Sequence, residues 1–292
     1  MRNQENNQYK TAPAPTSVGV GLKPAHYREI IETAPAIDWF EVHPENYMFE
    51  GGPSHAWLRE VRKSYPLSLH SVGLSLGSVQ SVDVTHLTWL ERLASNYEPF
   101  AISDHVSWST NSGDFLNDLL PLPYTHESLA VLSRNIDQVQ EHLGRSILVE
   151  NPSTYLQFQE EDYSEPDFIA AVCEQTGCGL LLDINNAYVC ARNHGFDPWS
   201  YLTHIPHDSV REIHLAGHSI TTVGDVEIRI DDHGSLVCDE VWQLYSQYIA
   251  TFGASPTLIE WDSNIPPLAT LISEVDKARA LINEAMNVGI GN

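Results

Sequence analysis

The sequence predicts an α/β fold of the TIM-barrel type, in which eight parallel strands alternate with helices. Eight short apolar runs alternate with helical stretches over about 250 residues, the usual length of such a barrel. Six of these runs end at a histidine, aspartate or glutamate, and active sites of TIM barrels lie at the C-terminal ends of the strands. An open doubly wound sheet is the alternative. We favour the barrel because the strand count closes and residues 18–21 lack the third glycine of a dinucleotide-binding turn.

The first half of the chain supplies four of the strands. We expect residues 1–16, rich in Asn, Gln, Ala and Pro, to form a flexible leader before a single metal-binding barrel domain at residues 17–288. Strands are predicted at 18–22, 37–42, 67–69 and 99–103, and helices at 24–33, 53–63, 85–96 and 126–143. Thr125 and Gly144 are the expected caps of the last of these helices. Residues 108–124 are predicted to be a long loop, and such loops are often functional.

The second half begins with the segment SILVENP at residues 146–152. This short apolar run suits a buried parallel strand that ends at Glu150 and Asn151 and is terminated by Pro152. Further strands are predicted at 179–182, 210–213 and 256–259. An acidic stretch at 160–167 leads into a helix that ends near Gly177, and helices are also predicted at 239–251 and 267–287. Residues 221–236 are a turn-rich insertion, and no element is assigned between Asp183 and residue 210.

The composition argues against several classes of protein. The 292 residues carry a formal net charge of −24, which repels nucleic acid. No apolar run approaches the ~20 residues needed to span a bilayer, and the N-terminus lacks the apolar core of a secretory signal. The four cysteines have no CxxC spacing, so we expect reduced core thiols in a cytoplasmic protein with no membrane partner.

The residues at the strand ends point to a metal site. In a barrel these ends converge on one pocket, and here they are His70, His105, Glu150, Asp183, His214 and Glu260. Each could singly be a satisfied core residue, but a cluster of buried acids repels itself unless a cation is present. Mixed imidazole and carboxylate ligands without cysteine suit iron, zinc or manganese.

Two further segments could hold an additional metal beside the first. Asp231, Asp232 and His233 follow the seventh strand, and Asn186 stands three residues after Asp183. A DxH pair alone is weak evidence, since loops often contain one by chance.

A GxSxG segment and several aromatic residues near strand ends are expected to have structural roles. Residues 73–77 spell GxSxG but lack the strand-turn-helix context of a nucleophile elbow, so we expect them to line the pocket. Trp39, Trp108, Tyr124 and Trp261 lie near strand ends, where they pack in the core or form a wall for a peptide substrate.

Eight motifs carry a family resemblance over residues 17–285. They are FEVHPENY (40–47), LSLHSVGLSLG (67–77), LLPLPY (119–124), VENP (149–152), LDINN (182–186), NHGFD (193–197), EIHLAGH (212–218) and LIEWD (258–262). The pattern resembles the multinuclear non-haem iron-dependent oxidative enzymes, domain-of-unknown-function family 692. It is most similar to the branch that modifies bufferin-type copper-responsive peptides and more distantly similar to the methanobactin-biosynthesis oxidase.

The resemblance implies a xylose-isomerase-like barrel with two or three iron ions of mixed Fe2+ and Fe3+ state. Members use dioxygen to convert cysteines of ribosomally made precursor peptides to thiooxazole or oxazolone/thioamide products, usually with a separate partner protein that presents the peptide. Copper homeostasis is the implied context of this branch.

The resemblance also implies a ligand set. His70, His105 and Glu150 would hold one ion, Glu150 would bridge to a second held by Asp183, His214 and Glu260, and Asn186, Asp231 and His233 would hold a third. The catalytic residues would be Glu150, Asp183 and Glu260, and Glu45, Asn46, His194, His218 and Asp262 would support the ligands or contact the substrate. Metal-dependent endonucleases on the same barrel have histidine where Asn186 stands, so we expect the third ion to be bound most weakly.

Three functions remain open from the sequence. The first is oxidation of peptide cysteines. The second is hydrolysis or isomerisation by a phosphodiesterase or sugar isomerase, in which a bound metal activates water. The third is metal binding without catalysis.

Overall fold

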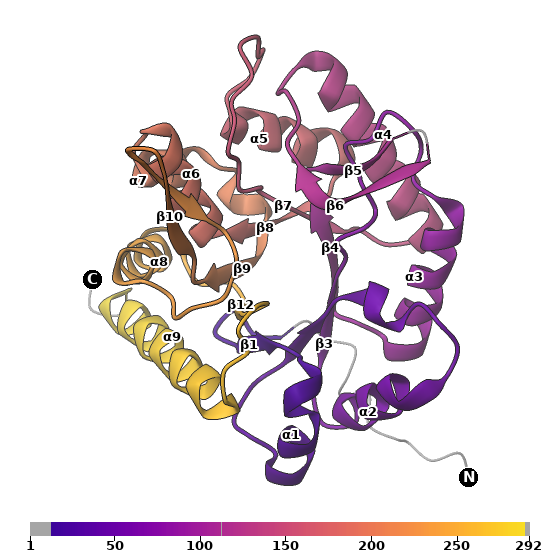
Figure 1. Ribbon diagram of the computed structural model, residues 1–292. Helices are drawn as coiled ribbons and strands as arrows, with labels where there is room; N and C mark the ends of the chain where they lie inside the picture. Colours follow the sequence, from indigo (N-terminus) through magenta and orange to yellow (C-terminus); the bar gives the residue numbers. More distant parts are fainter. Residues whose placement is uncertain (1–12, 112, 290–292) are drawn as a thin grey trace.

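The fold is a closed parallel barrel, as predicted. The computed structural model describes residues 13–111 and 113–289, so most of the predicted leader lies outside the described residues. Within them, eight parallel strands close in the order β1-β12-β9-β8-β7-β4-β3-β2 (Figure 1). Their bounds are β1 Val18–Gly21, β2 Phe40–Val42, β3 Leu67–His70, β4 Ala101–His105, β7 Leu148–Glu150, β8 Gly179–Asp183, β9 Val210–Ala216 and β12 Thr257–Glu260.

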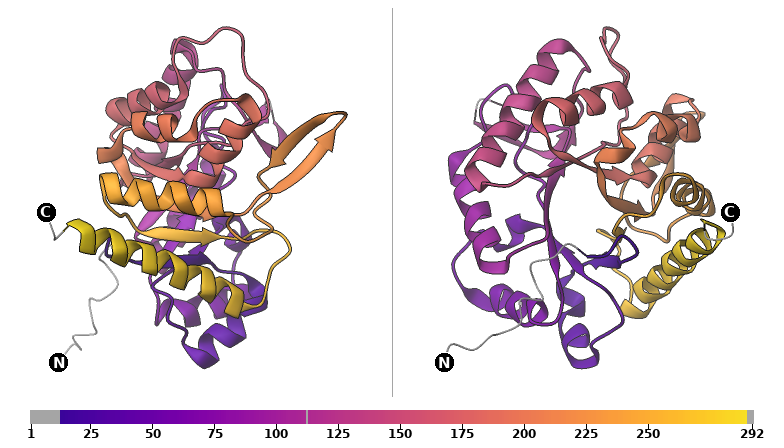
Figure 2. Two further views of the ribbon diagram at one scale, coloured as in Figure 1. Left: turned by 90° about the vertical axis from the view of Figure 1, so that its left-hand side faces the viewer. Right: turned by 180° about the vertical axis from the view of Figure 1, so that it is seen from behind.

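Helices surround the barrel and cover the outer faces of its strands (Figures 1 and 2). They are η1 Pro24–His26, α1 Tyr27–Thr33, η2 Pro44–Tyr47, α2 Gly52–Arg62, α3 Val84–Tyr97, α4 His126–Leu143, α5 Glu165–Thr176, α6 Ile184–His194, α7 Pro198–His204, η3 His207–Ser209, α8 Asp239–Phe252 and α9 Leu268–Gly289. The fourth predicted helix has the expected caps: the Thr125 hydroxyl accepts from the Ser128 amide, and Gly144 ends α4 with a φ of 64°. No described helix is long and apolar enough to cross a membrane.

The two segments predicted to be irregular instead contain β-hairpins. Strands β5 (Trp108–Asn111) and β6 (Asp114–Leu120) replace the expected long loop, and β10 (Ser219–Val223) and β11 (Val226–Ile230) lie in the expected insertion. The second hairpin closes through two residues beginning at Gly224, whose φ of 65° suits a tight turn. Both hairpins lie at the C-terminal end of the barrel, and Figure 2 shows β10–β11 projecting from the body.

Two α-helices lie where no element is predicted from the sequence. The α6 helix begins directly after β8, because the Asp183 side chain caps it by accepting from the Asn186 amide at 2.6 Å. The α7 helix has Asp197 as its N-cap and Pro198 in its first turn. The asparagines at 185 and 186 therefore belong to a helix rather than to a loop.

Trp39 does not form part of a substrate wall. It precedes β2, is 0% exposed and packs edge-on against Phe100 with ring centroids 5.0 Å apart. Gly19 leaves the space for its indole, since a Cβ there would lie 2.4 Å from the ring. The residue before a strand lies at the N-terminal end of the barrel, away from the strand ends that form the site.

Candidate metal centre

The register of the barrel brings the predicted strand-end residues together. His105 of β4 lies opposite Glu150 of β7, and Asp183 of β8 lies opposite His214 of β9. These four residues, together with His70 of β3 and Glu260 of β12, make up the predicted six, and each is between 0% and 8% exposed. The sequence prediction that these ends converge is confirmed by the closest contacts of their side chains.

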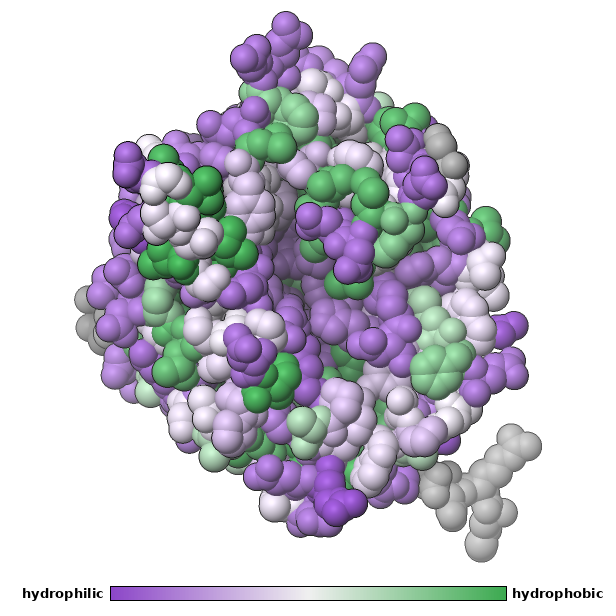
Figure 3. Space-filling model, in the orientation of Figure 1, coloured by the Kyte–Doolittle hydropathy of each residue, from purple (hydrophilic) through white to green (hydrophobic). Residues whose placement is uncertain are grey.

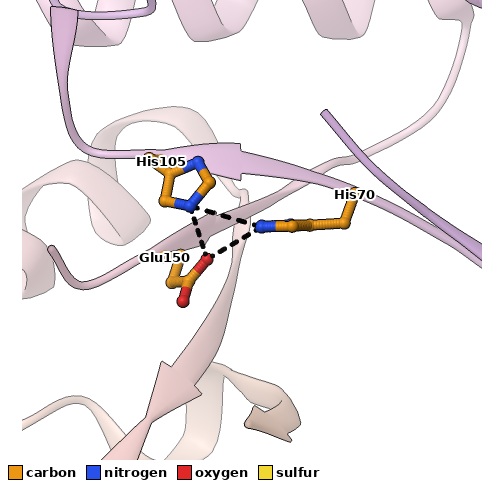
Figure 4. A group of neighbouring side chains, drawn as sticks. All are labelled: His70, His105 and Glu150. Atoms are coloured by element: carbon orange, nitrogen blue, oxygen red, sulfur yellow. Dashed lines mark hydrogen bonds and ion pairs between the residues drawn. The ribbon is translucent and has the colours of Figure 1, made fainter. Parts of the chain in front are cut away.

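His70, His105 and Glu150 form a compact triangle of ligand atoms (Figure 4). The two imidazole Nε2 atoms are 3.3 Å apart, and each lies 3.2 Å from Glu150 Oε2. Ligands at about 2.1 Å from a metal ion lie about 3.0–3.4 Å from one another in octahedral or tetrahedral geometry. The Ser103 hydroxyl lies 2.8 Å from His70 Nδ1, which leaves Nε2 of that ring directed at the triangle.

A second group of four side chains shares Glu150 with the first. One ligand atom from each of Glu150, Asp183, His214 and Glu260 lies within 4.8 Å of every other. His214 Nδ1 is 3.0 Å from Glu260 Oε2 and 3.9 Å from Glu150 Oε1. The two oxygens of Glu150 therefore face different groups, which is the geometry that a bridging carboxylate needs.

The third predicted group is also assembled at the same cavity. His233 Nε2 lies 2.7 Å from Asp231 Oδ1, yet it has no aligned hydrogen-bond partner among the described residues. Asn186, Asp231 and His233 line one cavity, and Asn186 Nδ2 lies 3.4 Å from Glu150 Oε1. Asn186 Oδ1 is buried and has no partner in the described part of the chain.

The charges of these groups are poorly balanced without a cation. Burial raises the pKa of Asp183 well above its usual range, and the charges of Glu150 and Asp231 raise it further. Burial also opposes ionisation of Glu260, but His233 and His214 outweigh it and lower that pKa well below its ordinary value. Glu150 Oε2 and Asp183 Oδ2 are buried without a hydrogen-bond partner in residues 13–111 and 113–289. This donor set fits divalent or trivalent metal ions, which neutralise the acids and satisfy the unpartnered oxygens.

Two of the five predicted supporting residues, Asp262 and His218, are connected to the metal site. Asp262 lies at the cavity and accepts from His233 Nδ1 at 3.0 Å. His218 lies farther out and is linked to the site through Asn185, which contacts His218 Nδ1 at 2.9 Å and donates to Asp231 at 2.7 Å.

Three other predicted supporting residues do not line the metal cavity. Glu45 accepts from the Ser71 hydroxyl and the Val72 amide and so holds the loop after β3. Asn46 is exposed, and His194 contacts Thr154 in a neighbouring cavity. These three residues therefore do not support the metal ligands directly, and a contact with the substrate stays a prediction for them.

Ser75 of the GxSxG segment is a structural residue. It is buried, with a φ of 54°, and its Oγ accepts from the amides of Ser109 and Thr110. None of residues 73–77 is among the described residues that line the metal cavity, so the expectation that this segment lines the pocket is wrong.

Two buried carboxylates beneath His214 were not predicted from the sequence. Glu41 Oε1 and Glu212 Oε1 lie 3.5 Å and 3.4 Å from His214 Nε2, and the two residues are 4% and 0% exposed. The available signal was strand periodicity, because Glu212 and His214 are two residues apart and therefore share one face of β9. His43, two residues after Glu41, also lines the metal cavity.

The metal cavity is small and is lined mainly by histidines and acidic residues. Its volume is about 210 Å³ and its lining includes His70, His105, Glu150 and Glu260. No Lys or Arg is among the described residues that line it. This volume lies below the range of about 300–1,000 Å³ typical of pockets that enclose drug-sized ligands.

Comparisons with known proteins agree with this architecture. A family model described as "RiPP precursor modification enzyme MbnB/TglH/ChrH" matches residues 17–283. A UPF0276 protein of Vibrio vulnificus strain YJ016 is 47% identical over 269 residues, which is 92% of each chain. Another UPF0276 protein, from Psychromonas ingrahamii, is 45% identical over 263 residues, 90% of this chain and 93% of the relative.

Solved structures with a similar fold come from enzymes of different activity. Endonuclease IV of Thermus thermophilus covers 93% of this chain and 99% of its own, with a TM-score of 0.58 and 16% identity. An L-ribulose 3-epimerase covers 93% and 96% with a TM-score of 0.59 and 11% identity. At these identities the likeness shows the xylose-isomerase-like barrel alone. The family model spans nearly the whole barrel, so the chain belongs to the MbnB/TglH/ChrH family of RiPP precursor modification enzymes.

Proposed function

We propose that this protein uses dioxygen and two or three iron ions to oxidise cysteine residues of a ribosomally synthesised precursor peptide. The observation that carries the proposal is the shared carboxylate of Glu150, whose two oxygens face two adjacent groups of ligand atoms. The product would be of the thiooxazole or oxazolone/thioamide type. Membership of a peptide-modifying family supports a peptide as the substrate.

The ligand assignment follows the geometry of the three groups. His70, His105 and Glu150 would hold one ion, and Glu150, Asp183, His214 and Glu260 would hold its neighbour. Asn186, Asp231 and His233 would hold a third ion more weakly, because an amide is a neutral ligand. We assign the central role in catalysis to Glu150, Asp183 and Glu260. Bound iron would supply one-electron redox chemistry and the Lewis acidity that deprotonates a thiol.

The burial, volume and lining of the metal cavity suit a small, uncharged or thiol-bearing side chain of a peptide. The nearly complete burial of the six strand-end residues keeps bulk water from the reacting group. A cavity of about 210 Å³ is compatible with a cysteine side chain. The absence of Lys and Arg among its described lining residues, together with a net charge of −24, disfavours a nucleic-acid substrate.

The proposal also includes a partner protein and a cellular location. We infer that a separate partner protein presents the peptide, as the family resemblance implies. Cys173, Cys178, Cys190 and Cys238 are free thiols, which supports a reducing, cytoplasmic location.

The test begins with protein purified without oxygen, followed by elemental analysis. The loaded protein is then mixed with a cysteine-containing peptide encoded beside its gene and with any neighbouring partner protein. We expect oxygen uptake and a mass loss in the peptide confined to cysteine. Zinc as the only metal, with no oxygen uptake, would contradict the proposal.

A matched control separates oxidation from the chemistry of the fold's other enzymes. The same preparation is offered an abasic oligonucleotide and a ketose. We expect neither to react. Cleavage or epimerisation that is abolished by Glu150→Gln would instead support the hydrolase or isomerase alternative.

A further inference from the structure

A second cavity lies beside the metal cavity and has a different character. Its volume is about 520 Å³ and its lining is predominantly apolar. It lies among α5, α6, α7 and the segment after β7, and we call it the side cavity. Residues that define it are Tyr124, Leu156, Phe158, Glu165, His194 and Phe196.

Two chain segments form a common wall between the two cavities. In the segment after β7, Ser153 lines the metal cavity whereas Thr154 and Leu156 line the side cavity. At the end of β6, Leu119 lines the metal cavity, and Pro121, directly after that strand, lines the side cavity. Because an extended peptide advances about 3.3–3.6 Å per residue, a chain with one residue in the metal cavity places a nearby residue at the side cavity.

The mouth of the side cavity exposes large apolar side chains. Leu156 is 51% exposed, Phe158 38% and Phe196 39%. Figure 3 shows that this end of the barrel is hollowed and that hydrophobic patches border the hollow. Grouped apolar side chains at the rim of a concavity are typical of an interaction site rather than of free surface.

The charged groups of the side cavity are all acidic. Glu161, Glu165 and Asp197 line it, and no Lys or Arg is among its described lining residues. The Glu165 carboxylate is held in place by the hydroxyls of Tyr124 and Tyr201, each donating at 2.7 Å. A positively charged group is the complement of this lining.

The side cavity has the features of a binding site and not of a second reactive centre. Its cysteine, Cys190, is buried, and burial raises the pKa of the thiol to about 12. A thiol in this state is a poor nucleophile. Thr154 Oγ1 contacts both Cys190 Sγ and His194 Nε2, so these polar groups are already paired.

We propose that the side cavity binds an aliphatic or aromatic side chain of the precursor peptide, with a Lys or Arg beside it, a few residues from the cysteine that is modified. The proposal deepens the proposed function and rests on it. It assigns peptide selection in part to this chain, through Leu156, Phe158 and Phe196 for the apolar group and Glu161 and Asp197 for the cation.

The test measures binding without oxygen, so that no oxidation is needed for a signal. The probes are three fluorescein-labelled ten-residue peptides with one cysteine. The first carries Phe-Lys three positions after the cysteine, the second replaces Phe with Ser, and the third replaces Lys with Glu. Fluorescence anisotropy with metal-loaded protein should show about tenfold or greater weakening for the second and third peptides.

Filling the side cavity should remove this discrimination. Ser200 lines it and is exposed on α7, so Ser200→Trp should bind all three peptides within about threefold of one another. Ser273→Trp, at an exposed position of α9, is the matched control and should discriminate among the three peptides as the wild type does. If Ser200→Trp does not fold, Phe158→Ser at the exposed mouth removes part of the apolar lining instead, and it should bind the first and second peptides within about threefold of each other.

The outcomes separate this proposal from the proposed function. Discrimination by the wild type that is lost in Ser200→Trp supports the side cavity even if the peptide is never oxidised. Equal binding of the three peptides by the wild type, or unchanged discrimination in Ser200→Trp and Phe158→Ser, overturns the proposal even if oxidation proceeds.

Discussion

Replacing Glu150 with glutamine should remove both central metal ions together. The substitution keeps the size and shape of the side chain and removes only its charge. Glu150 Oε2 lies 3.2 Å from the Nε2 atoms of His70 and His105, and its Oε1 faces His214 and Asn186. A neutral amide in this position cannot bridge two cations through two anionic oxygens.

The magnitude follows from the charge that is lost. Two unit charges about 4 Å apart interact by about 4 kcal/mol at an effective dielectric constant near 20, and a divalent ion doubles this to about 8 kcal/mol. The desolvation of a buried carboxylate offsets several kcal/mol of that gain. A net loss of about 3–5 kcal/mol per ion remains, which corresponds to a decrease in affinity of roughly a hundredfold to several thousandfold.

The assay is elemental analysis of protein equilibrated with a competing chelator. Glu141→Gln, on an exposed position of α4, is the matched control and should keep the wild-type metal content. A cooperative thermal transition of Glu150→Gln confirms that the variant is folded. If Glu150→Gln keeps the metal content of the wild type, Glu150 does not bridge two ions and the ligand assignment is wrong.

Three other predictions concern individual groups of the site. Asn186→Ala should lose mainly the third ion, so the metal content should fall by at most one ion per chain, and loss of all metal would contradict this. Burial alone lowers the pKa of His105, but the charges of Glu150 and Asp104 raise it to about 9, compared with ~6.5 in the unfolded chain. In chelator-treated protein the protonated His105 side chain should therefore contribute fully to the free energy of unfolding below about pH 6.5, and denaturant melts should show this contribution being lost as the pH rises through 9. Metal affinity should increase over the same pH interval, because metal binding displaces the proton of His105. Glu212→Leu should weaken metal binding by about ten- to a hundredfold, because the Glu212 carboxylate lies 3.4 Å from His214 Nε2 and orients that ring. Glu212→Gln, which retains a hydrogen-bond acceptor, should lose less metal affinity than Glu212→Leu. Equal losses of affinity for the two variants in chelator competition would show that Glu212 does not orient the His214 ring.

The convergence of the six strand-end residues could be predicted from sequence because one rule determines it. Each follows a short apolar run, and parallel strands of a closed barrel end at the same face. The observed register, with His105 opposite Glu150 and Asp183 opposite His214, is what that rule requires. The rule is independent of helix boundaries, so the site could be predicted although α6 and α7 were not.

The remaining features depend on contacts that no local pattern specifies. Glu41 and Glu212 come from strands far apart in sequence and meet only because the barrel closes around His214. The position of His194 in the neighbouring cavity depends on α6, which begins at the Asp183 cap and ends at His194. The sequences of the two hairpins at the C-terminal end alternate polar and apolar residues only over short stretches. They therefore resemble the sequences of turn-rich loops, and only the pairing of their strands distinguishes them. The side cavity is lined by five separate parts of the chain, α5, α6, α7 and the segments after β6 and β7, and no sequence pattern in any of them predicts it.

The central claim is that Glu150 joins neighbouring iron ions in one site. The most direct measurement is the Mössbauer spectrum of protein loaded with iron-57 and kept without oxygen. We predict two or three irons per chain, with at least two showing magnetic coupling that Glu150→Gln abolishes. A spectrum of isolated, uncoupled iron, or coupling that survives in Glu150→Gln, would contradict this claim.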